Sequence, residues 1–113
     1  MSSQGPVKEL DPTPLVNAIL EKTKAGKLKW DETADEDIFI VSVGGNTTLK
    51  VRQKFDQYQG DRYILSLLDE NGKLIWVIEE PWDLTKELFV LARRVALRVD
   101  ERMDALMGTL QRL

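Results

Sequence analysis

The chain has no histidine and no cysteine among its 113 residues. Histidine is the commonest general base and the commonest zinc ligand, and cysteine supplies thiolate ligands and disulfides. The two absences exclude catalysis based on histidine or cysteine, the usual structural zinc sites and any disulfide framework. No Ser-x-x-Lys motif or phosphate-binding loop is present either. We therefore expect neither an enzyme nor a cofactor.

Long apolar runs are also missing. No stretch approaches the roughly 18 apolar residues that a membrane-spanning helix needs. The opening residues MSSQGPVKELDPTP lack the apolar centre of a signal peptide. We expect a cytoplasmic protein with no membrane partner. The net charge of −3 also argues against nucleic acid, because binding phosphates needs a clustered positive field.

The composition that remains is that of an ordinary globular protein, with 42% hydrophobic and 31% charged residues. The length fits one domain. Residues 1–12 are polar and hold two prolines and a glycine, so we expect a flexible arm there and a single domain over residues 13–113.

The domain is expected to begin with a helix. Thr13 can cap free backbone N–H groups, and Pro14 suits the first helical position. Gly26 is a plausible end for this helix, because a left-handed glycine often terminates one. Leu28 and Trp30 follow, and we expect them to fold back onto the helix end, since burial of an aromatic side chain is strongly favourable.

Four segments have strand character, at residues 38–43, 47–55, 62–68 and 73–79. The second alternates: Leu49, Val51 and Phe55 are expected to face one way, and the basic residues Lys50, Arg52 and Lys54, with Thr48, the other. Turn signals between strands, such as Asn71-Gly72, favour an antiparallel meander. The acidic stretch 31–37 is read as a loop, since it lacks the calcium-loop spacing.

The last 30 residues are expected to form one long helix that begins near Pro81. Its apolar stripe consists of Leu84, Leu88, Leu91, Val95, Val99, Met103, Leu106, Leu110 and Leu113. At 1.5 Å per residue such a helix spans roughly 40 Å, longer than a strand of six residues at roughly 20 Å. Its C-terminal turns would then overhang the sheet and need another cover. Gly108 is a warning that the helix can end earlier.

The fold class that follows is α+β: a four-stranded antiparallel meander flanked by an N-terminal helix and a long C-terminal helix. Three of the four strands are apolar on both faces, so both faces of the sheet need cover. Either one helix lies on each face, or both lie on one face and a second copy of the chain covers the other.

Excess apolar surface without catalytic groups indicates a small protein-interaction module, a homodimer that also binds an unidentified protein. Assembly would use the long helix, the sheet face or both. Trp82, beside Pro81, is the best aromatic candidate for an interface. The full set of expected interface residues is Trp82, Phe89, Val90, Leu97, Met103, Leu106, Met107 and Leu110.

A nucleic-acid-associated regulator is the alternative. Arg94, Arg98 and Arg102 are spaced four residues apart and would line one face of a continuous helix. With the basic row Lys50, Arg52 and Lys54 they would offer an anion-binding surface. The competing interpretation is a solvated helix face whose long side chains cover apolar surface.

Overall fold

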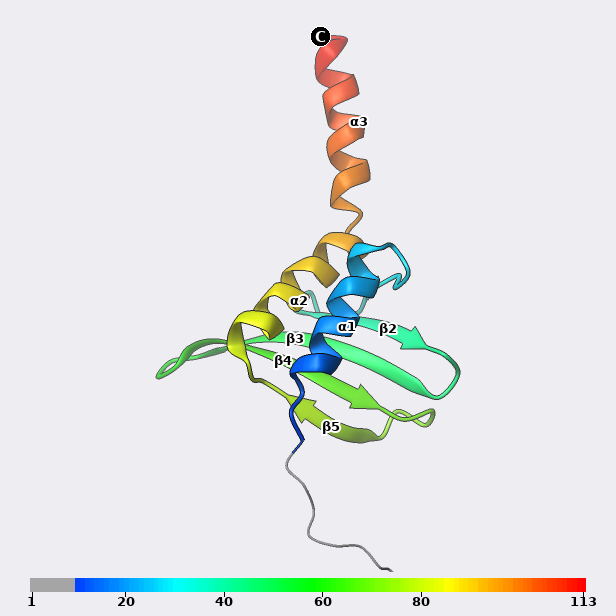
Figure 1. Ribbon diagram of the computed structural model, residues 1–113. Helices are drawn as coiled ribbons and strands as arrows, with labels where there is room; N and C mark the ends of the chain where they lie inside the picture. Colours follow the sequence, from blue (N-terminus) through cyan, green and yellow to red (C-terminus); the bar gives the residue numbers. More distant parts are fainter. Residues whose placement is uncertain (1–9) are drawn as a thin grey trace, which may run out of the picture.

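The computed structural model describes residues 10–113 and contains three helices and five strands (Figure 1). In chain order they are α1 (Thr13–Lys24), β1 (Asp31–Glu32), β2 (Ile38–Val43), β3 (Thr47–Asp56), β4 (Gly60–Leu68), β5 (Leu74–Ile78), α2 (Trp82–Ala96) and α3 (Val99–Gln111). The expected α+β class is confirmed. The first nine residues of the expected arm lie outside the described part.

The five strands form one antiparallel sheet in the order β1-β2-β3-β4-β5, which confirms the meander. β1 is the addition to the four expected strands. It pairs Asp31 with Ile40 of β2 and lies in the stretch interpreted as an acidic loop. Two acidic residues have low strand propensity and are too few to show alternation, so the sequence pattern gives no sign of this strand.

Both α1 and α2 lie on the same face of the sheet (Figure 1). The core lies between them and that face and includes the fully buried side chains of Val16, Phe39, Leu65 and Leu88. Of the two arrangements left open by the sequence, the structure therefore has both helices on one side. Within residues 10–113 no helix lies on the other side of the sheet.

The connection after α1 folds back as expected. The indole Nε1 of Trp30 donates to Thr23 Oγ1 at 3.0 Å, and that hydroxyl donates to the carbonyl oxygen of Ile19 at 2.8 Å. All three residues are buried. Because a buried polar group without a partner is costly, this chain of bonds fixes the loop that leads into β1. The start of α1 differs slightly: Pro12, not Thr13, is the N-cap, and Asp11 Oδ1 accepts a hydrogen bond from the backbone N–H of Thr13 at 3.0 Å.

The expectation of one long C-terminal helix is wrong. α2 ends at Ala96, and Arg98 adopts a left-handed backbone with φ 53° and ψ 46° before α3 begins at Val99. A left-handed residue is a common way to end a helix, but glycine usually supplies it, and an arginine gives no warning in the sequence. Gly108, the residue suspected of ending the helix, lies within α3. Figure 1 shows the consequence: α3 leaves the body of the molecule.

Candidate functional site

The junction between α2 and α3 is held by an ion pair. Arg94 Nε donates to Asp100 Oδ1 at 2.8 Å, and this hydrogen bond, together with the charge of Asp100, raises the pKa of the Arg94 side chain. Both side chains are more than half exposed, so the pair contributes little to stability. The pair connects Arg94 on α2 to Asp100 in the first turn of α3.

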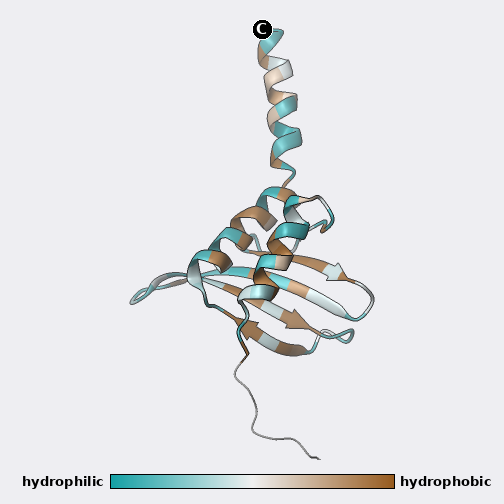
Figure 2. Ribbon diagram, viewed as in Figure 1, coloured by the Kyte–Doolittle hydropathy of each residue, from teal (hydrophilic) through white to brown (hydrophobic). Residues whose placement is uncertain are grey.

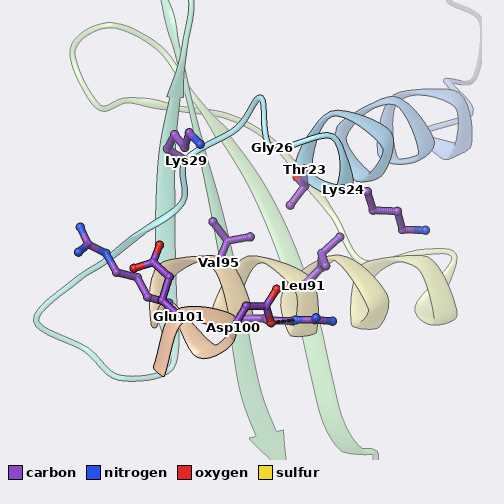
Figure 3. A pocket seen from close by; sticks show the side chains of 10 residues that line it. Thr23, Lys24, Gly26, Lys29, Leu91, Val95, Asp100 and Glu101 are labelled. Atoms are coloured by element: carbon purple, nitrogen blue, oxygen red, sulfur yellow. Dashed lines mark hydrogen bonds and ion pairs between the residues drawn. The ribbon is translucent and has the colours of Figure 1, made fainter. Parts of the chain in front are cut away.

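A groove of about 380 Å³ lies at this junction (Figure 3). Lys24 and Lys29 approach it from α1 and the following loop, Leu91 and Val95 form part of its apolar wall, and Glu101 enters from α3. Its lining holds four basic residues and two acidic ones, so side chains of both signs surround it with an excess of positive charge. Among the described residues no group of three or more acidic side chains is placed to hold a metal ion.

The interpretation of Arg94, Arg98 and Arg102 as one basic face is wrong. The three residues lie on α2, at the left-handed junction and on α3, so no single helix carries them. Arg98 and Arg102 line a second groove of about 680 Å³ together with the acidic residues Asp31 and Glu32. Arg98 and Arg102 therefore share this groove with carboxylates of the same chain, and Arg94 is paired with Asp100.

The second basic row lies elsewhere. Lys50, Arg52 and Lys54 on β3 alternate with Leu49 and Val51, which are buried beneath the helices. Since successive side chains point to opposite faces of a strand, the three basic residues lie on the helix-free side. The two basic groups of the sequence thus do not form one surface.

The helix-free side of the sheet, called here the open face, is mixed in character. Its apolar side chains come from β2, β4 and β5 and are Ile38, Ile40, Ile64, Leu68, Ile75 and Val77. Ile75 is 59% exposed and Val77 39% exposed, while the other four are half-buried. The basic residues Lys50, Arg52 and Lys54 run through the middle of this apolar area. Arg62 joins them from β4, but it is engaged by Glu79 with oxygen distances of 2.8 Å.

α3 carries a second unpartnered apolar surface. None of its 13 residues is buried. Its apolar row, defined by Met103, Leu106, Met107 and Leu110, has exposures between 51% and 58%. Figure 2 shows hydrophobic and hydrophilic residues mixed along this isolated helix. Asp100 and Asp104 lie on one edge of the row, at a spacing of four residues, and Arg102 lies on the other.

The remaining residues expected at an interface differ in how far they are exposed. Phe89 is only 4% exposed and packs against Phe39 and Tyr63 at ring-centroid distances of 5.7 and 5.6 Å, so it belongs to the core and is removed from the candidate interface. Leu97 is half-buried against the same core. Val90 is 54% exposed on α2.

Trp82 is partly exposed but firmly held. Its indole Nε1 donates to the carbonyl oxygen of Asp61 at 3.1 Å, and its ring meets Tyr63 edge-on. Lys86 Nζ lies 4.9 Å from the ring centroid, a distance suited to a cation–π contact. The side chain thus joins the β3–β4 hairpin to the start of α2, which gives it a structural role within one chain.

The sequence did not reveal one apolar depression. Leu15, Leu28, Val43 and Leu67 line a groove of about 370 Å³ between α1 and the strands beneath it. Each had been assigned to a helix, a loop or a strand separately, and only the packing of α1 against the sheet brings them together. It is a shallow feature at the edge of the core.

The chain matches no protein-family model, no curated protein and no solved structure. No helix in residues 10–113 has both the length and the apolar character required to cross a bilayer. The functional argument therefore depends on the two unpartnered surfaces, the open face and the apolar row of α3.

Proposed function

We propose that this chain is a small non-enzymatic protein-interaction module that works as a homodimer assembled through α3. The observation that carries the proposal is that α3 has no buried residue while its apolar row presents two leucines and two methionines to solvent. Full burial of such a side chain is worth about 1.5–3 kcal/mol. A partner that covers the row would therefore gain substantially.

The length of α3 supports the same proposal. Isolated helices shorter than about 12–15 residues are marginal in water, and most helical stability in proteins comes from packing an amphipathic face. α3 has 13 residues, and its strongest described contacts are with α2 at the junction. A second copy of the chain is a suitable cover, since twofold homodimers are the commonest protein assemblies.

The test is the mass of the protein in solution, measured by size-exclusion chromatography with light scattering. Twice the 12.9 kDa of one chain is expected for the wild type. The double variant Leu106→Asp/Leu110→Asp places two charges in the apolar row and is expected to run as a monomer. Tyr58→Asp, at an exposed site on the β3–β4 hairpin, is the matched control and should remain dimeric.

A wild-type protein that stays monomeric at high concentration contradicts the proposal. So does a Leu106→Asp/Leu110→Asp variant that dimerises as strongly as the wild type, because α3 would then have no part in the contact.

A further inference from the structure

The open face and α3 are two apolar surfaces that no other part of residues 10–113 covers, and they do not meet within one copy. α1 and α2 occupy the opposite side of the sheet, and α3 extends away from the body (Figure 1). The structure thus has a helix without a surface to pack on and a sheet face without a helix. Two copies that exchange their α3 helices would cover both the apolar row of α3 and the open face.

We infer that, in the homodimer proposed above, α3 of each copy docks on the open face of the other copy's sheet. The inference rests on that proposed dimer and adds the surface that receives α3. Each sheet would then have α1 and α2 on one side and the other copy's α3 on the second side. This is the two-sided cover that a sheet apolar on both faces needs.

Charge disfavours the first alternative, in which two open faces pack against each other. Lys50, Arg52 and Lys54 form a row of like charges in the middle of each face. Face-to-face packing of two copies would bring six cations together, while the carboxylates of Asp31, Asp56 and Glu79 lie toward the edges of each face and Glu79 is already paired with Arg62. Burying charges that lack a partner is costly. A helix with an acidic edge avoids this cost.

α3 has such an edge. Asp104 and Asp100 flank the apolar row, whereas Glu101 lies on the opposite side of the helix. Asp100 already accepts a hydrogen bond from Arg94, so Asp104 is the carboxylate beside the row that has no ion-pair partner among the described residues. With its apolar row on the isoleucines of the open face, α3 would bring this edge beside the cations of β3.

Pairing of α3 with a second α3 is the other alternative. It would cover the apolar row but leave six apolar residues of each open face in water. It would also consist of a single seam with four apolar residues from each helix, whereas stable interfaces bury roughly 1,600 Å² in total. Exchange creates two helix–sheet contacts in the same dimer.

The dimensions agree with exchange. α3 is about 20 Å long at 1.5 Å per residue. β3, with ten residues, is about 33 Å long, and five strands spaced about 4.8 Å apart give a sheet roughly 19 Å wide between the outer strands. The helix therefore fits on the open face either along the strands or across them.

Cross-linking tests the arrangement, because the chain contains no cysteine of its own. Two single-cysteine variants are used: Leu106→Cys on α3 and Ile64→Cys on the open face. The variants are mixed, equilibrated and treated with a short bis-maleimide, and the products are identified by mass spectrometry. Exchange predicts that the cross-link between residues 106 and 64 is the dominant dimeric product. Tyr58→Cys mixed with Leu106→Cys is the control and should give little product.

The outcomes separate the inference from the proposed dimer. A dimeric wild type with a dominant link between two Leu106→Cys chains would overturn exchange and leave the α3 dimer standing. A monomeric wild type would overturn both. A dimer without either link would also overturn exchange.

A charge test gives a second readout. The triple variant Lys50→Gln/Arg52→Gln/Lys54→Gln is expected to raise the dimer dissociation constant about tenfold or more and to weaken its dependence on salt. Lys22→Gln/Lys27→Gln/Arg93→Gln makes the same charge change on the helix side of the molecule and is the matched control. Equal dissociation constants and equal salt dependence for the two variants would contradict docking on the basic row.

Discussion

The body of the molecule, meaning the sheet with α1 and α2, and α3 come from one chain with similar alternation of apolar and charged residues. The body buries its apolar side chains, whereas α3 exposes them. In the body, Leu88 and Leu65 are fully buried between the helices and the sheet. In α3, Leu106 and Leu110 are more than half exposed. The difference begins at one residue, Arg98, whose left-handed backbone directs α3 away from the surface that α2 covers. Helical periodicity alone therefore does not tell which helices of a chain pack on its own core.

The largest expected effect tests this comparison with one leucine from each region. Leu88→Ala removes a fully buried side chain and should lower the free energy of unfolding by about 2–5 kcal/mol, because both transfer free energy and packing are lost. Leu106→Ala, measured by denaturant unfolding in protein diluted until it is monomeric, should change it by less than about 0.5 kcal/mol. Equal losses for the two variants would show that α3 is packed on its own chain.

Within the body, the next largest loss of stability is expected when the hydrogen bond between Trp30 and Thr23 is removed. Thr23→Val keeps the shape of the side chain but leaves the buried indole N–H of Trp30 without an acceptor, so we expect a loss of about 1–3 kcal/mol in unfolding free energy. Chemical denaturation followed by tryptophan fluorescence measures it. In the matched variant Thr47→Val, on β3, the changed side chain makes no described hydrogen bond, and stability should hardly change. A loss in Thr47→Val as large as that in Thr23→Val would contradict the role of the indole bond.

At the α2–α3 junction, a glycine substitution at Arg98 distinguishes two separate helices from one continuous helix, because the change in unfolding free energy has opposite signs in the two cases. Arg98→Gly should raise stability, by up to about 1 kcal/mol, since glycine adopts positive φ without the steric penalty of a side chain. In one continuous helix the same change would lower stability by roughly the same amount. Thermal or denaturant unfolding of the monomer decides between them, with Arg93→Gly within α2 as the control that should lose stability.

Much of the body could be predicted from the sequence because each element has a local signal. The alternation of Leu49 and Val51 with Lys50 and Arg52 fixed β3 and the side that faces the core. The turn residues Asn71 and Gly72 marked the β4–β5 connection, where Gly72 has φ 79°. Such features depend on neighbouring residues only, so the sequence pattern is sufficient for them.

The candidate surfaces were less predictable because they depend on where elements lie relative to one another. Three of the four expected strands are apolar on both faces, so the sequence could not decide whether α1 and α2 lie on one face or on opposite faces. Phe89 lies between Leu88 and Val90 in the sequence, so the apolar pattern did not show which of them is buried. Its contacts with Phe39 and Tyr63 place it in the core. The basic set Arg94, Arg98 and Arg102 depended on an unbroken helix and was lost when Arg98 proved left-handed.

The smallest expected effect is electrostatic and lies at the tip of the β3–β4 hairpin. Asp56 Oδ1 accepts hydrogen bonds from the backbone N–H groups of Tyr58 and Gln59 at 2.8 and 3.1 Å, and these bonds lower the pKa of its carboxyl. A carboxyl whose pKa is lower in the folded state stabilises the fold at pH values above its unfolded pKa, and this stabilisation is lost as pH falls through the folded value. Because the group is fully exposed, the contribution is small.

Asp56→Ala should therefore be slightly less stable than the wild type at pH 7, and the difference should shrink as the pH is lowered below about 4, the usual pKa of an aspartate. Denaturant midpoints of both proteins between pH 7 and pH 3 measure the trend, with Asp83→Ala, for which no hydrogen bond of the carboxylate is described, as the reference. A difference between Asp56→Ala and wild type that grew toward low pH would contradict the assignment, because protonation can only weaken a turn held by an ionised acceptor. The turn would then be held by backbone conformation alone, and the hairpin tip would not depend on charge.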